Sequence, residues 1–257
     1  MAVRLAVRVA LVVLAAHTPV FAQHLADDQS RRQALEFYRT GQEHMAAERF
    51  DLAAQAFTSA IGKDELLSVA HYQLGQAYMN LRRYGSAIQA YNGCIDALKG
   101  LHSLEESSKF QVDKQREDEI RELRVEINQL KNLSPLKREV LEQRLRGLEQ
   151  QRADYRAEFR PPAFVLLALG SAYFRNGELA AAEAEWEAAI AADPKYGEAH
   201  NNLAVVYMMT MRKKQAENAI KAAEKSGFRV NPQLKEDIRR MAVENPNTQI
   251  PNPKPQS

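Results

Sequence analysis

The chain has 257 residues, with 35 basic and 33 acidic side chains and a single cysteine, Cys94. A formal net charge of +2 gives no basic excess of the kind that attracts nucleic acid or an anionic membrane surface, so neither is expected as a partner. One cysteine cannot form an intramolecular disulfide, and the length suits one elongated domain with an insertion better than two globular domains.

The first 22 residues have the pattern of a secretory signal peptide. Arg4 and Arg8 supply the positive start, Val9–Ala16 is an apolar stretch too short to span a bilayer, and Val20–Ala22 has the small-x-small pattern of a cleavage site. We expect cleavage after Ala22 and export, in a bacterium to the periplasm. The mature chain would not be a lipoprotein, because no cysteine occurs before Cys94.

Two copies of a 34-residue unit follow a polar lead-in at residues 23–33, and they cover residues 34–67 and 68–101. Gly41 recurs as Gly75, and Phe57 recurs as Tyr91. Each copy is predicted to form two amphipathic helices, with small residues where the helices approach and bulky ones filling the gap to the next unit. Cys94 stands where the other copies have alanine, so it is predicted to be a small buried residue.

Residues 102–162 interrupt this period, because Gly75 and Gly170 are 95 residues apart, one period plus 61. Apolar residues recur there at steps of three and four on two segments, separated by a turn at 132–135. This pattern predicts an antiparallel coiled-coil hairpin that projects about 40 Å. Its seam is predicted to contain Ile120, Leu123, Ile127, Leu141, Leu145 and Leu148, with the rhythm continuing through Tyr155 and Phe159 to Pro161–Pro162. The hairpin is either a self-satisfied spur or a docking arm that could form a homodimer.

The 34-residue period returns at residues 163–196 and 197–230, where Gly170 and Trp186 take the places of Gly41 and Phe57. Residues 231–244 are predicted to form a capping helix, with Asn231 as N-cap and Pro232 at the first helical position. Residues 245–257 contain four prolines and no apolar period, which predicts disorder.

The third copy carries the full pattern of small, aromatic and proline positions. Its residues are Leu169, Gly170, Tyr173, Gly177, Ala182, Trp186, Ala189, Asp193 and Pro194. This period and pattern resemble the tetratricopeptide repeat. The resemblance implies an all-α, right-handed solenoid of about four helix-turn-helix repeats, whose first helices line a concave groove. It also implies protein–protein interaction in place of a reaction, because the family is defined by its scaffold.

In similar repeats, positions 2, 5, 9, 12 and 13 of each unit point into the groove. At these positions we expect a partner-binding groove formed by Tyr38, Met45, Tyr72, Gln76, Met79, Phe164, Leu167, Phe174, Arg175, Asn201, Met208 and Met209. Their composition disfavours a clamp for a peptide carboxylate, which needs several converging basic residues. It favours an amphipathic helix or an extended hydrophobic segment. The alternative is that the protein's own helices fill the groove.

No catalytic, metal-binding or cofactor-binding constellation is recognisable in the sequence. The six histidines show no zinc-protease spacing, and there is no phosphate-binding glycine loop. The sequence therefore predicts a non-enzymatic scaffold of the cell envelope that binds a protein or peptide in its groove. One alternative is a carrier or chaperone for a hydrophobic ligand or an unfolded secreted chain. A second is a structural oligomer assembled through the hairpin.

Overall fold

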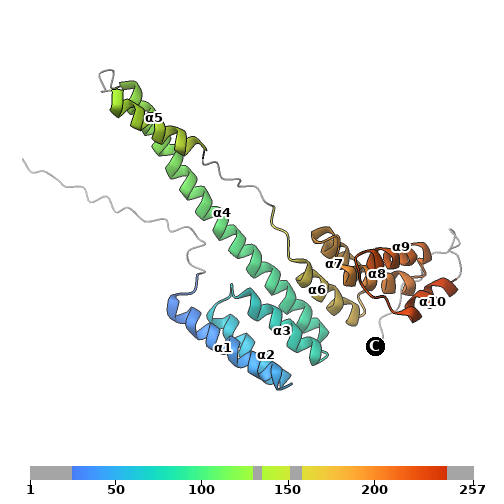
Figure 1. Ribbon diagram of the computed structural model, residues 1–257. Helices are drawn as coiled ribbons and strands as arrows, with labels where there is room; N and C mark the ends of the chain where they lie inside the picture. Colours follow the sequence, from blue (N-terminus) through green and yellow to red (C-terminus); the bar gives the residue numbers. More distant parts are fainter. Residues whose placement is uncertain (1–24, 130–134, 151–157, 242–257) are drawn as a thin grey trace, which may run out of the picture.

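The computed structural model describes residues 25–129, 135–150 and 158–241, and these contain ten helices and no strand. The first helices of the four repeats are α1 (Asp28–Ala46), α3 (Ser68–Asn80), α6 (Ala163–Arg175) and α8 (Gly197–Met209). The second helices are α2 (Phe50–Lys63), α4 (Tyr84–Gln129), α7 (Leu179–Ala192) and α9 (Lys213–Lys225). The remaining helices are α5 (Pro135–Gln150) and α10 (Pro232–Arg240). The predicted all-α solenoid of four repeats is confirmed (Figure 1).

Within each repeat the two helices approach so closely that the first helix needs a glycine or alanine. A Cβ added to Gly41 would lie 2.5 Å from the Phe57 ring, and one added to Gly75 would lie 2.5 Å from the Tyr91 ring. Gly170 faces the Trp186 indole at the same distance. A larger side chain at these glycines would therefore push the aromatic ring out of the core.

Between repeats, the first helix of one unit packs on the second helix of the preceding unit, always through the same positions. Leu74 and Ala77 of α3 join a core with Phe57 of α2. After the insertion, Leu169 and Ala172 of α6 join a core with Tyr91 of α4 in the same way. The 61 inserted residues therefore leave the stacking register of the solenoid intact.

The insertion begins as a continuation of a repeat helix. In repeats one and three the second helix stops just before Asp64 and Asp193, whose carboxylates accept hydrogen bonds from the backbone N–H groups of Leu66 (3.1 Å) and Lys195 (2.9 Å). Leu98 occupies that position in repeat two and can accept no such bond. α4 consequently runs on for 46 residues and projects away from the repeats (Figure 1).

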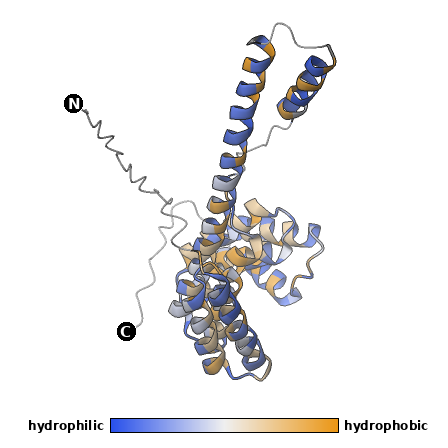
Figure 2. Cartoon of the chain, turned by 90° about the vertical axis from the view of Figure 1, so that its left-hand side faces the viewer, coloured by the Kyte–Doolittle hydropathy of each residue, from blue (hydrophilic) through white to orange (hydrophobic). Residues whose placement is uncertain are grey.

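α5 lies along the far part of α4, and the two helices contact each other. Of the predicted seam, Leu123 is buried, whereas Ile120, Ile127, Leu141, Leu145 and Leu148 are partly buried. Ion pairs join Arg124 to Glu149 (2.6 Å) and Arg144 to Glu119 across the same two helices. Figure 2 shows that this arm is mainly hydrophilic, with interspersed hydrophobic residues.

The second arm differs from the sequence-based prediction at its base. Residues 158–162 are not helical, although the apolar rhythm predicted helix through Phe159 up to Pro161–Pro162. The Phe159 ring instead lies 5.7 Å from the His102 ring on α4. The two prolines restrict the residues before them to extended backbone, which explains the non-helical segment next to them.

The two ends of the solenoid also differ slightly from the predicted bounds. α1 begins at Asp28, inside the predicted lead-in, because the Asp27 carboxylate accepts from the N–H of Ser30 (2.7 Å) and so provides an N-cap. The capping helix is α10, with Asn231 accepting from the N–H of Gln233 (2.8 Å). The predicted signal peptide, the turn at 132–134, Tyr155 and the tail at 245–257 lie outside the described residues.

Candidate functional site

A cluster of aromatic side chains lines a cavity of about 380 Å³ between the second and third repeats. We call it the aromatic pocket. Its lining residues are Tyr72, Gln76, Met79, Asn80, Tyr91, Phe164, Leu167, Ala168, Ser171, Tyr196 and Glu198. They come from α3, α4, α6, the segment before α8, and the first turn of α8. The pocket therefore exists only because the repeats on the two sides of the insertion stack directly.

Tyr72 is the central ring of the aromatic pocket. Its ring lies 5.6 Å from Tyr91 on one side and 5.2 Å, edge-on, from Phe164 on the other. Gln76 donates a hydrogen bond from Nε2 to the Tyr72 hydroxyl (2.9 Å). Gln42 and Tyr38 form the same pair in repeat one (3.1 Å), so repeats one and two share this arrangement.

Phe164 differs from its neighbours because it remains 48% exposed, although it is a large aromatic residue. Leu167, one turn further along α6, is buried and forms part of the core as well as the pocket wall. The pocket thus has a buried side formed by Leu167 and an apolar side, Phe164, that is half exposed to solvent.

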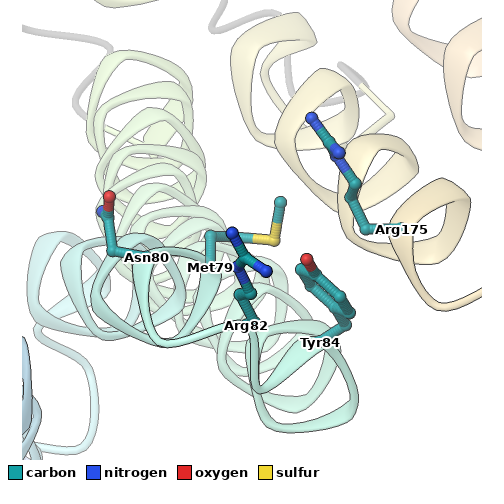
Figure 3. Close-up of a pocket in the computed structure, with 5 residues that line it drawn as sticks. All are labelled: Met79, Asn80, Arg82, Tyr84 and Arg175. Carbon is teal, nitrogen blue, oxygen red and sulfur yellow. The ribbon is translucent and has the colours of Figure 1, made fainter.

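A second cavity of about 430 Å³ adjoins the first, because Met79 and Asn80 line both. We call it the arginine pocket, and its remaining lining residues are Arg82, Tyr84 and Arg175. In Figure 3, Tyr84 lies between Arg82, which follows α3, and Arg175, which stands on the facing helix α6. Neither arginine has an ion-pair partner among the described residues. Together the two pockets form what we call the central furrow.

The tyrosines of the aromatic pocket are neutral around pH 7. Burial raises the pKa of Tyr72, and the Glu198 carboxylate raises it further, although the Gln76 hydrogen bond acts in the opposite direction. Burial likewise raises the pKa of Tyr91 and of Tyr196. The charges lining the furrow are therefore Arg82 and Arg175 at one end and Glu198 at the other.

The structure places six of the predicted groove residues in the central furrow and the other six elsewhere. Those in the furrow are Tyr72, Gln76, Met79, Phe164, Leu167 and Arg175. Tyr38 and Met45 pack against the core around Phe57, and Phe174 and Met208 pack against the core around Trp186. Asn201 and Met209 line neither pocket.

Eight lining residues of the furrow are not among the predicted site residues, namely Asn80, Arg82, Tyr84, Tyr91, Ala168, Ser171, Tyr196 and Glu198. Arg82 and Tyr84 follow the first helix of repeat two, beyond the positions that usually face the groove. Tyr196 is the last residue of repeat three, and its neighbour Glu198 opens α8. The sequence offered one signal for Arg82. A charged residue stands at a position where repeat three has Gly177.

Cys94 is the free thiol closest to this region, and it is buried. Burial raises its pKa to about 11, which leaves the thiol protonated and unreactive near neutral pH. It fills the same core position as Ala60, Ala189 and Ala223, as predicted. No helix within the described ranges is both long and apolar enough to cross a membrane.

Stacked helix pairs that each contact only their neighbours define the class of α-solenoid folds. A family model described as TPR repeat matches residues 170–210, and one described as tetratricopeptide repeat matches residues 38–100. Residues 38–100 and 170–210 are therefore tetratricopeptide repeats, and proteins built of this repeat are in general protein–protein interaction scaffolds and not enzymes.

Solved structures with the same repeat are similar to the chain at low identity. PilW, a type IV pilus biogenesis factor, is 16% identical, with 84% of this chain and 87% of PilW covered and a TM-score of 0.38. A thermophilic TPR protein from Thermus thermophilus is 18% identical over 80% of this chain and 97% of its own, with a TM-score of 0.33. YrrB, a TPR protein with an unusual peptide-binding site, is 14% identical over 86% and 98%, with a TM-score of 0.30. A search of curated proteins found no match.

Proposed function

We propose that this protein is an exported, non-enzymatic scaffold that holds a segment of a partner protein in the central furrow. The observation that carries the proposal is Phe164, a phenylalanine left 48% exposed on the wall of a cavity that already contains three tyrosines. An exposed aromatic beside an open pocket is typical of a recognition site, because covering it removes apolar surface from water. Export rests on the signal-like pattern of residues 1–22.

The two ends of the solenoid are less suited to binding than the furrow. At the N-terminal end, Glu36, Thr40 and Glu43 of α1 are exposed at the positions where the other repeats bury apolar residues. At the other end, α10 packs on α9 and buries Ile238. Because one end of the solenoid is polar and the other is covered by α10, a partner is expected to bind in the furrow and not at either end.

The proposal is tested by placing a charge on the open wall. We expect Phe164→Asp to abolish partner capture, since the carboxylate would be desolvated by any apolar segment in the pocket. Because Phe164 is half exposed, the melting temperature should change little. The measurement is a pull-down of the mature chain from an envelope extract, with bound proteins compared between variants by mass spectrometry.

Phe110→Asp is the matched control, because Phe110 is 61% exposed and lies on α4, outside the furrow. A protein captured by the wild type and by Phe110→Asp, but not by Phe164→Asp, supports the furrow as the binding site. Equal capture by the wild type and both variants would contradict it.

Further measurements on the same proteins distinguish the scaffold from the two alternatives, a carrier or chaperone and a structural oligomer. A carrier or chaperone would retain a non-protein ligand in native mass spectrometry, or would suppress the aggregation of many unrelated unfolded chains. An oligomer assembled through the α4–α5 arm would keep its mass in Phe164→Asp. N-terminal sequencing of the protein from intact cells tests cleavage after Ala22.

A further inference from the structure

We infer that the segment bound in the central furrow is extended and acidic, with a carboxylate in the arginine pocket and an apolar side chain in the aromatic pocket. This inference rests on the proposed function, and it names the chemistry of the partner. Two guanidinium groups that have no ion-pair partner in the described part of the chain lie beside an apolar cavity, and they complement an acidic side chain next to a bulky apolar one.

The two arginines approach the arginine pocket from different repeats. Arg82 belongs to the turn after α3, and Arg175 is the last residue of α6. The neighbouring Arg83 already forms an ion pair with Asp51 (3.2 Å), whereas no acidic side chain among the described residues neutralises Arg82 or Arg175. In Figure 3 the Tyr84 hydroxyl lies beside Arg82, and Arg175 extends from the facing helix α6, so the pocket presents two positive charges and a hydroxyl donor to a carboxylate.

Free hydrogen-bonding groups between the two pockets favour an extended segment over a helix. Gln76 uses its Nε2 on Tyr72, and Asn80 uses its Nδ2 on the Gln76 backbone carbonyl. The side-chain carbonyl oxygens of both residues have no partner within the described part of the chain. An extended segment can donate backbone N–H groups to them, but a helix has already used its own.

The shared wall fixes the spacing of the two partner side chains. Met79 and Asn80 line both pockets, so the pockets are immediate neighbours. In an extended chain, residues two apart point to the same side and lie about 7 Å apart. The expected pattern is therefore Asp or Glu followed or preceded at two positions by Leu, Met or an aromatic residue. Glu198, at the far end of the aromatic pocket, disfavours a second acidic residue there.

The probe is a displayed library of random twelve-residue peptides, selected on the full mature protein and, in parallel, on Phe164→Asp. Peptides enriched on the wild type and not on Phe164→Asp are binders of the furrow. We expect them to carry the acidic and apolar residues at the spacing given above. No differential enrichment would overturn the proposed function, whereas apolar peptides without an acidic preference would overturn this inference alone.

The most enriched peptide is then synthesised with a fluorophore, and its affinity is measured by anisotropy. Arg82→Gln combined with Arg175→Gln should weaken it about five- to tenfold at low salt, and the peptide's own Glu→Gln or Asp→Asn change should weaken it by the same factor. The two changes together should not be additive, because they remove one interaction. Additive losses would contradict the assignment of the carboxylate to this pocket.

Arg83→Gln combined with Arg229→Gln is the matched control, because it removes the same charge at two exposed arginines outside the furrow. Glutamine at position 82 leaves the left-handed backbone of that residue no more strained than arginine does. An equal loss of affinity in the control would show a general effect of net charge and would overturn the inference.

Discussion

Position 15 of every repeat has a left-handed backbone, at the tight turn between the two helices. The φ angles are 56° at Glu48, 57° at Arg82, 87° at Gly177 and 60° at Met211. Only repeat three has the glycine that this conformation favours, because a Cβ clashes with the following carbonyl oxygen in the left-handed region. The fold therefore imposes a geometry that three of the four local sequences disfavour.

Met211→Gly should raise the free energy of unfolding by up to about 1 kcal/mol, because it relieves this strain at a residue that is 59% exposed. The reverse change, Gly177→Ala, should lower it by about 1 kcal/mol. Urea unfolding followed by circular dichroism measures both. If Gly177→Ala left the stability unchanged, the left-handed backbone would not be the reason for that glycine.

The residues that carry the packing could be predicted from the sequence, whereas more than half of the residues lining the furrow could not. Gly75 and Tyr91 recur at a fixed period, because the same helix–helix contact must be made in each repeat. Arg82 and Tyr84 do not recur at the corresponding positions of the other repeats. Their meeting with Arg175 depends on how two repeats, separated by an insertion, stack in space.

The second helix of repeat two shows how a single missing turn residue can change an element. Asp64 and Asp193 end the corresponding helices, and Gly227, with a φ of 86°, stands at this position after α9. Leu98 replaces these stop residues, so α4 continues without a break into the arm. The periodic seam predicted two paired arms, but periodicity alone could not tell that the first arm and the repeat helix are one element.

Replacing residues 98–162 by Asp-Glu-Leu-Leu, the sequence of residues 64–67, should restore both the stop and the 34-residue step. We expect a shorter, cooperatively folding solenoid, because α6 already packs on α4 as α3 packs on α2. Thermal unfolding followed by circular dichroism, compared with that of the full mature chain, checks this. Non-cooperative melting would show that the arm is needed to hold the repeats together.

At the scale of the whole molecule, the repeat array is closed at both ends. Positions 3, 7 and 10 of the first helix are buried as Ala70, Leu74 and Ala77 in repeat two, but in repeat one they are exposed as Glu36, Thr40 and Glu43. At the opposite end, Lys213 donates hydrogen bonds to the backbone carbonyls of Arg239 (2.8 Å) and Met241 (2.6 Å), which fixes the end of α10. Repeat arrays need such ends to remain soluble.

Opening both ends should convert the molecule into a self-associating unit. The variant combines Glu36→Ala, Thr40→Leu and Glu43→Ala with removal of residues 231–257, which exposes α9. We expect head-to-tail oligomers of increasing size, since such an interface does not close on itself. Light scattering after gel filtration measures the mass, and either change alone serves as the control. A combined variant with the mass of the wild type would refute this explanation.

Because α4 is continuous, it also fixes the distance between the aromatic pocket and the tip of the arm. Tyr91, in the wall of the aromatic pocket, and Gln129, at the far end of the arm, belong to one helix without a proline, separated by about 57 Å at 1.5 Å per residue. The arm therefore holds its tip at a fixed distance from the aromatic pocket. A molecule bound near the tip would keep a constant distance from a segment bound in the furrow, because the helix between them has no break.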